Sequence, residues 1–428
     1  MAEQVSSLKT GIKYKNTPIG KIPVDWEVAR FKNIATAFYN GGTPDTTNKD
    51  YWNGGIPWIT GADFENQKVK TIRKYITPDG VKNSATNVIP KGNLLIVTRT
   101  GVGKLAIAPF DIAISQDITG VILDSQKASL EFIYWYLDFI SSKLKATIQG
   151  TSINGLLRTD LEEIDLPLPI VAEQKIIAEI LTTVDEAIEK TAQIIEKTKE
   201  AKKGLMQKLL TRGIDHKKFK KTEVGEIPIE WEMVRLGDLC NGQPEYGANV
   251  PSIDMDKSLP RYIRITDVKE DGKLLKSTWQ SIKREFAEPY ILKEGDFLFA
   301  RSGATVGKTY LYRNKDGECA FAGYMIRFKP KPMQLLPDFL FQYTHSNFYY
   351  NWVKGMLRAG AQPNINAQEY SNIPVPRPLI NEQKKIAEIL SFVDEKIEKE
   401  TKHQEQLESL KKGLMQVLLT GRIRVNVL

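Results

Sequence analysis

Apolar residues recur at steps of four and three along two stretches of the chain that contain no proline. The first stretch runs from residue 172 to about 210, and the second from 381 to about 419. A seam that persists for more than three heptads predicts two long helices that pair as a coiled coil. The seam positions expected to make this contact are Ile177, Leu181, Val184, Ile188 and Ile195 in the first helix, and Ile386, Leu390, Val393, Ile397 and Leu407 in the second.

Two arrangements of these helices remain open. Each helix follows a globular region of the same chain, so the two can pair antiparallel with one another or serve separate partners. A surface helix with an ordinary apolar stripe is the alternative to a coiled coil. Each helix continues without a breaker for about 38 residues, or roughly 57 Å at 1.5 Å per residue, and this length favours pairing.

Outside the long helices the hydrophobic pattern changes to short runs. Residues 94–98 and 297–300 have the composition of strands, and each run follows a glycine turn. The aromatic-rich segments 130–137 and 336–343 predict buried helices. A proline-rich connector follows each of these segments and forces an extended backbone, which ends the globular region. The fold class predicted is therefore mixed α/β.

Most of these features occur twice, about 205 to 209 residues apart. The repeated motifs are the IPxxWE lead-in (22–27 and 227–232), the xPLP or xPVP connector (166–169 and 373–376), EQKxIAEIL (173–181 and 382–390) and GLMQxLLT (204–211 and 413–420). So long a period excludes a solenoid, whose units run roughly 20 to 50 residues. It indicates a duplicated domain with an internal pseudo-two-fold repeat, and therefore a target with two parts.

The repeat divides the chain into six parts. They are an N-terminal segment (1–21), a first globular domain (22–170), a central helix (171–212), a second globular domain (213–379), a C-terminal helix (380–420) and a tail (421–428). The sequence at 8–12 resembles those that follow the two long helices. The repeat is therefore circular, and we predict that the two termini lie close together.

Composition narrows the class of protein. The 428 residues are 41% hydrophobic and 26% charged, as in a soluble protein with several domains. A leader and a long apolar stretch are both missing, so we expect a cytoplasmic protein. Cys240, Cys319 and three scattered histidines predict neither a disulfide framework nor a metal site. The net charge of +8 is compatible with a nucleic-acid partner.

Two basic glycine turns, 99–104 and 301–308, are the first candidates for DNA contact. Their spacing departs from GxxxxGK[ST], so nucleotide hydrolysis is not expected. Such turns bring backbone N–H groups and basic side chains to phosphates, although a tight hairpin turn with solvated charges is the alternative. The candidate residues are Arg99, Thr100 and Lys104 in the first turn, and Arg301, Ser302, Thr305 and Lys308 in the second.

Two further pairs of polar loops differ between the repeats. Divergent loops on a duplicated scaffold are what two different base sequences require, although ordinary drift explains them equally well. Loops 41–52 and 241–249 supply Thr43, Asn48, Lys49 and Trp52, and Gln243, Tyr246 and Asn249. Loops 150–154 and 361–366 supply Thr151 and Asn154, and Gln362 and Asn364, for which capping of the next segment is the alternative role.

Enzymatic signatures are missing from the sequence. It contains no Asn/Asp-Pro-Pro-aromatic tetrapeptide, no glycine-rich cofactor loop after a strand, no GxSxG and no HExxH. We therefore expect no catalytic residue and no cofactor bound by this chain. A duplicated, basic, two-headed protein of this kind is typical of a molecule that reads DNA.

The lead-in, the connector, the helix start and the helix end together resemble the specificity subunit of type I restriction-modification systems. The resemblance covers nearly the whole chain and includes the order of domain, helix, domain, helix. It implies two target recognition domains, each reading one half of a bipartite site in double-stranded DNA. It also implies that the conserved helices pair antiparallel and set the spacer.

The resemblance implies partners as well. Two modification (methyltransferase) subunits would bind S-adenosylmethionine and methylate adenine, and restriction (endonuclease) subunits would use ATP and Mg to translocate and cut DNA. This chain would hold none of those activities. Two alternatives remain: the recognition subunit of a fused or two-component restriction-methylation system, and a coiled-coil adaptor with two protein-binding heads.

Overall fold

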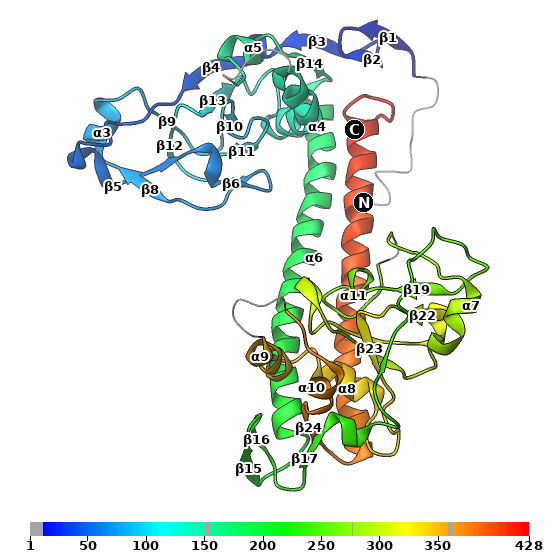
Figure 1. The fold of residues 1–428 in the computed structure, drawn as a ribbon. Helices are drawn as coiled ribbons and strands as arrows, with labels where there is room; N and C mark the ends of the chain where they lie inside the picture. The colour runs from blue at the N-terminus through cyan, green and yellow to red at the C-terminus, as the bar shows by residue number, and fades with distance from the viewer. Residues whose placement is uncertain (1–11, 150–154, 276, 358–362, 428) are drawn as a thin grey trace. The chain divides into compact units, whose positions relative to one another are not determined.

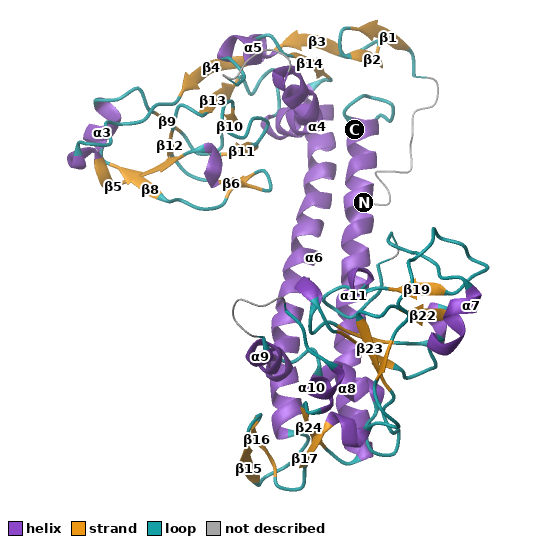
Figure 2. Ribbon diagram, viewed as in Figure 1, coloured by secondary structure: helices purple, strands orange, loops and turns teal. Residues whose placement is uncertain are grey.

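The computed structural model describes residues 12–149, 155–275, 277–357 and 363–427. The chain forms two compact units, here called unit 1 (Met1–Ala192 with Lys402–Leu428) and unit 2 (Gln193–Thr401). Helices and strands are mixed in both units (Figure 2), as the sequence predicts. Each unit contains one globular part and a segment of both long helices.

The two predicted long helices are α6 (Val171–Arg212) and α11 (Ile380–Leu418), both labelled in Figure 1. In unit 1, Ile177 and Leu181 of α6 share a buried cluster with Met415 and Leu418 of α11. Asp185, further along α6, pairs with a lysine that lies earlier in α11. The residue numbers therefore run in opposite directions along the two helices, which confirms the antiparallel pairing.

The ion pair between the helices occurs once in each unit. In unit 1, Lys411 Nζ of α11 lies 2.6 Å from Asp185 Oδ1 of α6. In unit 2, Lys202 Nζ of α6 lies 2.6 Å from Asp394 Oδ1 of α11. The lysine thus comes from α11 in unit 1 and from α6 in unit 2, and the accepting aspartate comes from the other helix in each case. This exchange is the signature of the predicted pseudo-two-fold repeat.

Unit 1 contains two four-stranded sheets. One is antiparallel with the strand order β11-β10-β13-β4, and the other has the order β8-β5-β12-β9 with β5 and β12 parallel. The strands are β4 (Ala35–Asn40), β5 (Trp52–Ile59), β8 (Lys74–Ile76), β9 (Asn87–Ile89), β10 (Leu94–Val97), β11 (Leu105–Ile107), β12 (Ile112–Ile114) and β13 (Ile118–Leu123). The predicted strand at 94–98 is β10, and the predicted buried helix at 130–137 is the start of α4 (Leu130–Gln149).

Unit 2 repeats this plan with shorter elements. The sheet β18-β23-β20-β21 corresponds to β4-β13-β10-β11, and the parallel pair β19-β22 corresponds to β5-β12. The strands are β18 (Glu245–Tyr246), β19 (Arg261–Ile263), β20 (Phe297–Ala300), β21 (Thr309–Leu311), β22 (Cys319–Phe321) and β23 (Met325–Phe328). The aromatic helix is split into α8 (Pro337–Tyr343) and α9 (Asn347–Met356).

Short elements complete both units, and two-stranded pairs join the lead-ins to the connectors. In unit 1 they are β1 (Tyr14–Thr17), β2 (Gly20–Pro23), β3 (Glu27–Arg30), α2 (Phe31–Ile34), η1 (Lys49–Tyr51), η2 (Gly61–Asp63), β6 (Phe64–Glu65), β7 (Lys68–Val69), α3 (Pro78–Lys82), α5 (Arg158–Glu162) and β14 (Asp165–Leu168). In unit 2 they are β15 (Phe219–Thr222), β16 (Gly225–Pro228), β17 (Glu232–Arg235), η3 (Leu236–Leu239), η4 (Ile265–Asp267), α7 (Arg284–Ala287), η5 (Glu288–Tyr290), η6 (Gly303–Thr305), η7 (Asn314–Asp316), α10 (Ala367–Ser371) and β24 (Pro374–Arg377).

A buried glutamine at the start of each long helix fastens the helix to its globular part. In unit 1, Gln174 accepts from the backbone N–H of Ser129, 2.7 Å away, and donates to the carbonyl of Pro169 at 2.8 Å. Ser129 lies just before α4, and Pro169 lies in the connector. Because an unpaired buried amide is costly, both elements must meet the helix at this point.

The same joint recurs in unit 2. Gln383 accepts from the N–H of Leu336 at 2.9 Å and donates to the carbonyl of Pro378, also at 2.9 Å. Leu336 precedes α8 as Ser129 precedes α4. The repeated EQ dipeptide is therefore a structural joint in both units.

The glutamate of each EQ dipeptide binds the tryptophan of the lead-in and one basic residue. Trp26 Nε1 donates to Glu173 Oε2 at 3.2 Å, and Arg424 makes a two-nitrogen contact with Glu173 at 2.6 and 2.7 Å. Arg424 also contacts Asp25 and lies over the Trp26 ring. The hydrogen bonds to Glu173 raise the pKa of the Arg424 guanidinium.

In unit 2 a histidine takes the place of the arginine. Trp231 Nε1 donates to Glu382 Oε2 at 3.0 Å, and His216 Nε2 lies 2.9 Å from Glu382 Oε1. Gly213 and Gly421, which precede His216 and Arg424, both have positive φ, +60° and +67°. The segment 421–424 thus does in unit 1 what 213–216 does in unit 2. The predicted proximity of the termini concerns residues 1–11 and 428, which lie outside the described residues.

We expect the substitution Glu173→Gln to lower the free energy of unfolding by about 3 kcal/mol, because it leaves the largely buried Arg424 guanidinium without its main partner. Urea unfolding followed by tryptophan fluorescence measures this change, since Trp26 lies at the joint. Arg30→Gln is the control, because its pair with Glu163 is about half exposed, with side-chain exposures of 46% and 47%, and is expected to cost no more than about 1 kcal/mol. Equal losses for the two variants would contradict the importance of the joint.

Candidate nucleic-acid interface

A polar and aromatic cluster surrounds the end of strand β20 in unit 2. Arg301 follows β20, Tyr246 ends β18, Tyr324 precedes β23 and Asn364 precedes α10. The backbone N–H of Arg301 donates to the carbonyl of Tyr324 at 3.0 Å, and Ser302 forms a β-bridge with Asn364. Strands and loops that are far apart in the sequence therefore meet here. We call these four residues the reading cluster of unit 2.

The Arg301 side chain is held in place from two directions. Its guanidinium carbon lies 4.8 Å from the centre of the Tyr246 ring, a cation–π contact. Its Nε donates to Asn364 Oδ1 at 3.4 Å. Tyr246 is itself fixed, because its hydroxyl accepts from the N–H of Ala367 at 3.1 Å, at the start of α10.

Arg301 has no carboxylate partner among the described residues. Other arginines of unit 2 are paired with acidic side chains, namely Arg264 with Asp267, Arg284 with Glu318, Arg313 with Glu294 and Asp338, and Arg327 with Glu245 and Asp296. The two tyrosines of the cluster are open to solvent, with Tyr246 41% and Tyr324 61% exposed. The cluster therefore presents a guanidinium without a carboxylate partner, beside the exposed ring of Tyr246.

Unit 1 has the same backbone frame at this place. The N–H of Thr98 donates to the carbonyl of Asp117 at 2.7 Å, as the N–H of Arg301 does to Tyr324. The N–H of Leu156 donates to Thr98 O at 2.7 Å, as that of Ile365 does to Arg301 O. Thr98 is thus the structural counterpart of Arg301, and Asp117 is the counterpart of Tyr324.

The remaining counterparts follow from the neighbouring strands. The N–H of Gly41 donates to Ile118 O at 3.2 Å, and that of Gly247 donates to Met325 O at 3.3 Å. Asn40 therefore corresponds to Tyr246, one residue earlier, and Gly155 corresponds to Asn364. The four equivalent positions share a backbone and have no side chain in common.

These counterparts correct two correspondences expected from the sequence. The turn of unit 2 has one more residue than that of unit 1 between the strand and its lysine, so Arg99 aligns with Ser302 and not with Arg301. Gly41 corresponds to Gly247 and not to Asn241, because β18 starts later in its loop. Asn366 caps α10, and Leu157 occupies the equivalent position before α5.

The other candidates in unit 1 have varied surroundings. Arg99 and Thr100 are exposed at the turn, and Thr43 contacts Gln116. Asn48 caps η1 by accepting from the N–H of Asp50, and Lys49 is exposed in that turn. Trp52 Nε1 donates to Asp45 O at 3.0 Å, and the Trp52 ring lies 5.1 Å from Lys74 Nζ. Thr151 and Asn154 lie outside the described residues.

Among the unit 2 candidates, Gln243 and Asn249 are exposed in the loops on either side of β18. Thr305 donates to the carbonyl of Ser302 at 3.3 Å within η6. Gln362 lies outside the described residues. The structure thus brings Tyr246, Arg301, Ser302 and Asn364 together. Sequence reasoning missed Tyr324, Asn40, Thr98 and Asp117, because only strand pairing places them at this site.

The two turn lysines point toward main-chain oxygens. Lys104 Nζ donates to the carbonyls of Gly61 and Phe64 at 3.1 and 3.2 Å. Lys308 Nζ lies 3.5 Å from the carbonyl of Val268 and 2.8 Å from Glu270 Oε1. Each ammonium anchors the neighbouring short helix. This geometry favours the alternative of a structural turn over the predicted phosphate contact.

The predicted helix-pairing residues differ in burial. Ile177, Leu181, Ile195, Ile386 and Leu390 are buried, with at most 5% exposure. Val184, Ile188, Val393, Ile397 and Leu407 are partly exposed. Four of the five buried positions lie where a long helix begins, next to the globular part of its unit, and Ile195 lies further along α6.

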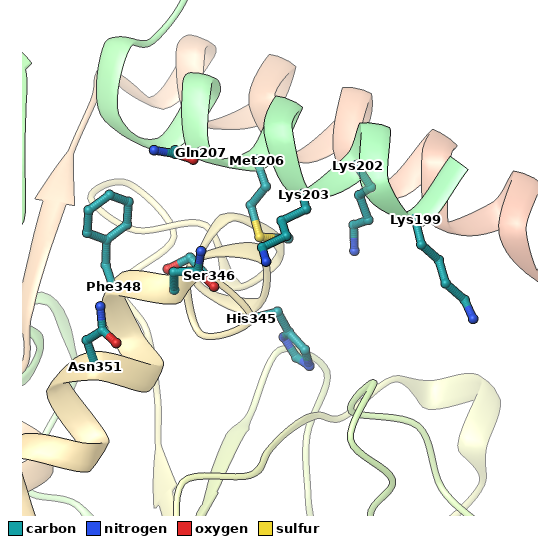
Figure 3. Close-up of a pocket in the computed structure, with 10 residues that line it drawn as sticks. Lys199, Lys202, Lys203, Met206, Gln207, His345, Ser346, Phe348 and Asn351 are labelled. Atoms are coloured by element: carbon teal, nitrogen blue, oxygen red, sulfur yellow. The ribbon is translucent and has the colours of Figure 1, made fainter. Parts of the chain in front are cut away.

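A pocket of about 500 Å³ lies in unit 2 between α6 and the turn that joins α8 to α9. Met206 and Lys203 extend from α6 toward His345 and Ser346 (Figure 3). Burial lowers the pKa of His345, whose Nδ1 lies 2.7 Å from the carbonyl of Phe341. None of the candidate contact residues lines this pocket, so we do not count it as part of the interface.

The described part of the chain offers no group of three or more His, Cys, Asp or Glu side chains arranged to hold a metal ion. Cys240 and Cys319 are buried free thiols, and burial raises the pKa of each to about 12. None of the helices that the structure describes is long and apolar enough to cross a membrane.

The comparisons with known proteins agree with this architecture. The family model described as "Type I restriction modification DNA specificity domain" matches residues 23–200 and again 228–409. The chain belongs to this family. The two matches show that its DNA specificity domain is present twice.

Full-length relatives carry the same description. The chain is 30% identical over 420 residues to the type I restriction enzyme MjaVIII specificity subunit of Methanocaldococcus jannaschii, covering 95% of this chain and 94% of the relative. It is 25% identical to the EcoBI specificity subunit of Escherichia coli over 66% of this chain and 63% of the relative. The crystal structure of the S subunit from M. genitalium has the same fold, with a TM-score of 0.62 at 16% identity over 96% of this chain and 97% of that one.

We expect Lys104→Ala to lower stability by about 1.5–3 kcal/mol, because its charged hydrogen bonds to two carbonyls are lost. The salt dependence of DNA binding should stay unchanged, since the ammonium is already occupied. Arg99→Ala is the matched variant from the same turn, and a phosphate contact there would reduce the slope of log K against log salt by about 1. Measurement of binding from low to moderate salt separates the two. A shallower slope for Lys104→Ala would instead support the phosphate contact expected from the sequence.

Proposed function

We propose that this chain is the DNA sequence-specificity subunit of a type I restriction-modification complex and that each unit reads one half of a bipartite site. The observation that carries the proposal is the pair of equivalent sites at the ends of β10 and β20. Their backbone hydrogen bonds are the same, and their side chains differ at all four positions. A shared frame with different polar side chains is what reading two different half-sites requires.

The proposal assigns different tasks to the candidate residues. Arg301 with Tyr246 and Asn364 in unit 2, and Asn40 and Asp117 in unit 1, are placed to meet base edges. Exposed Arg99, Thr100 and Lys49 are placed to meet phosphates, which position a protein on DNA without reading its sequence. The chain's excess of positive charge supports this second task.

The partners follow from the duplication. Two modification subunits would bind, one for each copy of the helix end that contains Gly204 or Gly413. A glycine inside a helix costs about 1 kcal/mol relative to alanine, and a Cβ at either glycine would meet nothing within 4 Å. Close approach of a second chain at both places would explain why glycine stands there in spite of this cost. Restriction subunits would complete the complex.

Catalysis would belong to those partners. The modification subunits would bind S-adenosylmethionine and methylate the DNA, and the restriction subunits would use ATP and Mg. This chain would select the sequence. The helices α6 and α11 would set the number of unread base pairs between the half-sites, because a helix of fixed length holds its two ends at a fixed distance.

Exchange of residues 22–165 for the corresponding domain of another specificity subunit should change one half-site only. The reason is that this range supplies the sheets of unit 1, whereas the strands that carry the reading cluster of unit 2 lie at residues 245–328. Methylation mapping of a host genome that carries the complex shows both half-sites at once. The unaltered chain is the control, and a change in both halves would contradict modular reading.

Insertion of four residues in both α6 and α11 should lengthen the spacer by one or two base pairs, since four residues add roughly 6 Å of helix and each base pair spans about 3.4 Å. The same genome mapping measures the spacer. Insertion of four residues into the exposed loop at 254–258 is the matched control and should leave the spacer as it was. If the spacer kept its length after the helix insertion, the helices would not set it.

A further inference from the structure

The reading cluster of unit 2 holds an arginine whose outer nitrogens have no partner among the described residues. The Nε atom is engaged by Asn364 at 3.4 Å, and the plane of the guanidinium is supported by the Tyr246 ring at 4.8 Å. Neither Nη atom pairs with an acidic group among the described residues, unlike those of Arg264, Arg284 and Arg313. Two parallel donors are thus held ready for a ligand with two acceptors.

We propose that Arg301 reads a guanine in the half-site recognised by unit 2. The inference rests on the proposed function and adds the identity of one base. In the major groove guanine presents two acceptors, N7 and O6, whereas adenine presents one acceptor and one donor. Two donors in a fixed plane match guanine and mismatch adenine, so the preference follows from geometry.

The support around Arg301 distinguishes base reading from phosphate binding. A phosphate accepts a cation from many directions, so a flexible lysine or arginine is sufficient for it. A base edge requires the planar side chain to keep one orientation. The ring of Tyr246 and the amide of Asn364 restrict that orientation, and the bond from Ala367 N to the Tyr246 hydroxyl restricts the ring in turn. Tyr246 and Asn364 are therefore positioning residues.

Unit 1 cannot make the same contact at the equivalent position. Thr98 stands where Arg301 stands, and it is 5% exposed, with its hydroxyl 3.3 Å from the carbonyl of Asp117. The neighbouring counterparts also differ. Asn40 supplies an amide where unit 2 has the Tyr246 ring, and Asp117 supplies a carboxylate where unit 2 has the Tyr324 ring. The guanine contact therefore belongs to one half-site, and the two half-sites differ at this base pair.

The experiment is selection of DNA sites from a random pool by the full-length chain purified with its co-expressed modification subunits. The half-site of unit 2 is the one that stays unchanged when residues 22–165 are exchanged. With the unaltered chain it should contain an invariant guanine. With Arg301→Ala, binding to the preferred site should weaken by about 10- to 100-fold, and preference should be lost at that guanine alone.

Four further variants complete the experiment. Arg301→Lys keeps the charge and loses the paired donors, so it should also lose the guanine preference. Tyr246→Leu removes the supporting ring and should weaken discrimination at the same base, while Tyr246→Phe keeps the ring and should restore most of it. Arg284→Ala, which removes an arginine paired with Glu318 on the surface of the same unit, is the control and should leave every preference unchanged.

Each outcome decides a different point. Equal weakening of binding to all sequences by Arg301→Ala, with the guanine preference kept, would overturn base reading and assign Arg301 to a phosphate. A unit 2 half-site without an invariant guanine would overturn the inference as well. Failure of the unaltered complex to select any sequence would instead contradict the proposed function. Circular dichroism of each variant confirms that a loss of binding does not come from unfolding.

Discussion

The Glu-Gln dipeptide at the start of each long helix is the constraint on which the rest of the structure depends. Glu173 is 1% exposed and Gln174 is fully buried, so their polar atoms must be paired inside the protein. The partners come from the lead-in, the connector, the aromatic helix and the segment after the opposite helix. One turn of helix thereby fixes the position of four other elements.

Because the joint holds the globular part in place, the side chains at the ends of the sheet strands can differ between the two units. The frame at the reading positions is made of backbone hydrogen bonds, such as those from Thr98 N and Arg301 N, which any residue except proline can form. Replacement of the side chains therefore costs little stability, because neither the joint nor the sheet core depends on them. The same separation explains why the EQ dipeptides are identical in the two repeats while Asn40 and Tyr246 differ.

The sequence was sufficient for the helices and the duplication, because their signals are local and repeated. The period of Ile177, Leu181 and their successors predicts α6 directly. The site was predicted only in part. Arg301, Tyr246 and Asn364 lie in candidate loops, but Tyr324 joins them through the pairing of remote strands, which no local pattern encodes. The surroundings of Lys104 depend on the fold in the same way: a lysine in a glycine turn is expected in solvent, and only the fold brings its ammonium to the carbonyls of Gly61 and Phe64.

The partner of the glutamate follows it in the chain in unit 1 and precedes it in unit 2. The energies show why both orders are possible. In unit 1, Arg424 lies 251 residues from its glutamate, and in unit 2, His216 lies 166 residues from its own. This difference is less than a doubling, so it costs less than about 0.6 kcal/mol of loop-closure entropy. Loss of the buried partner costs about 3–5 kcal/mol. The energy of the contact therefore outweighs the difference in the length of chain between its residues, and the joint can form with either order.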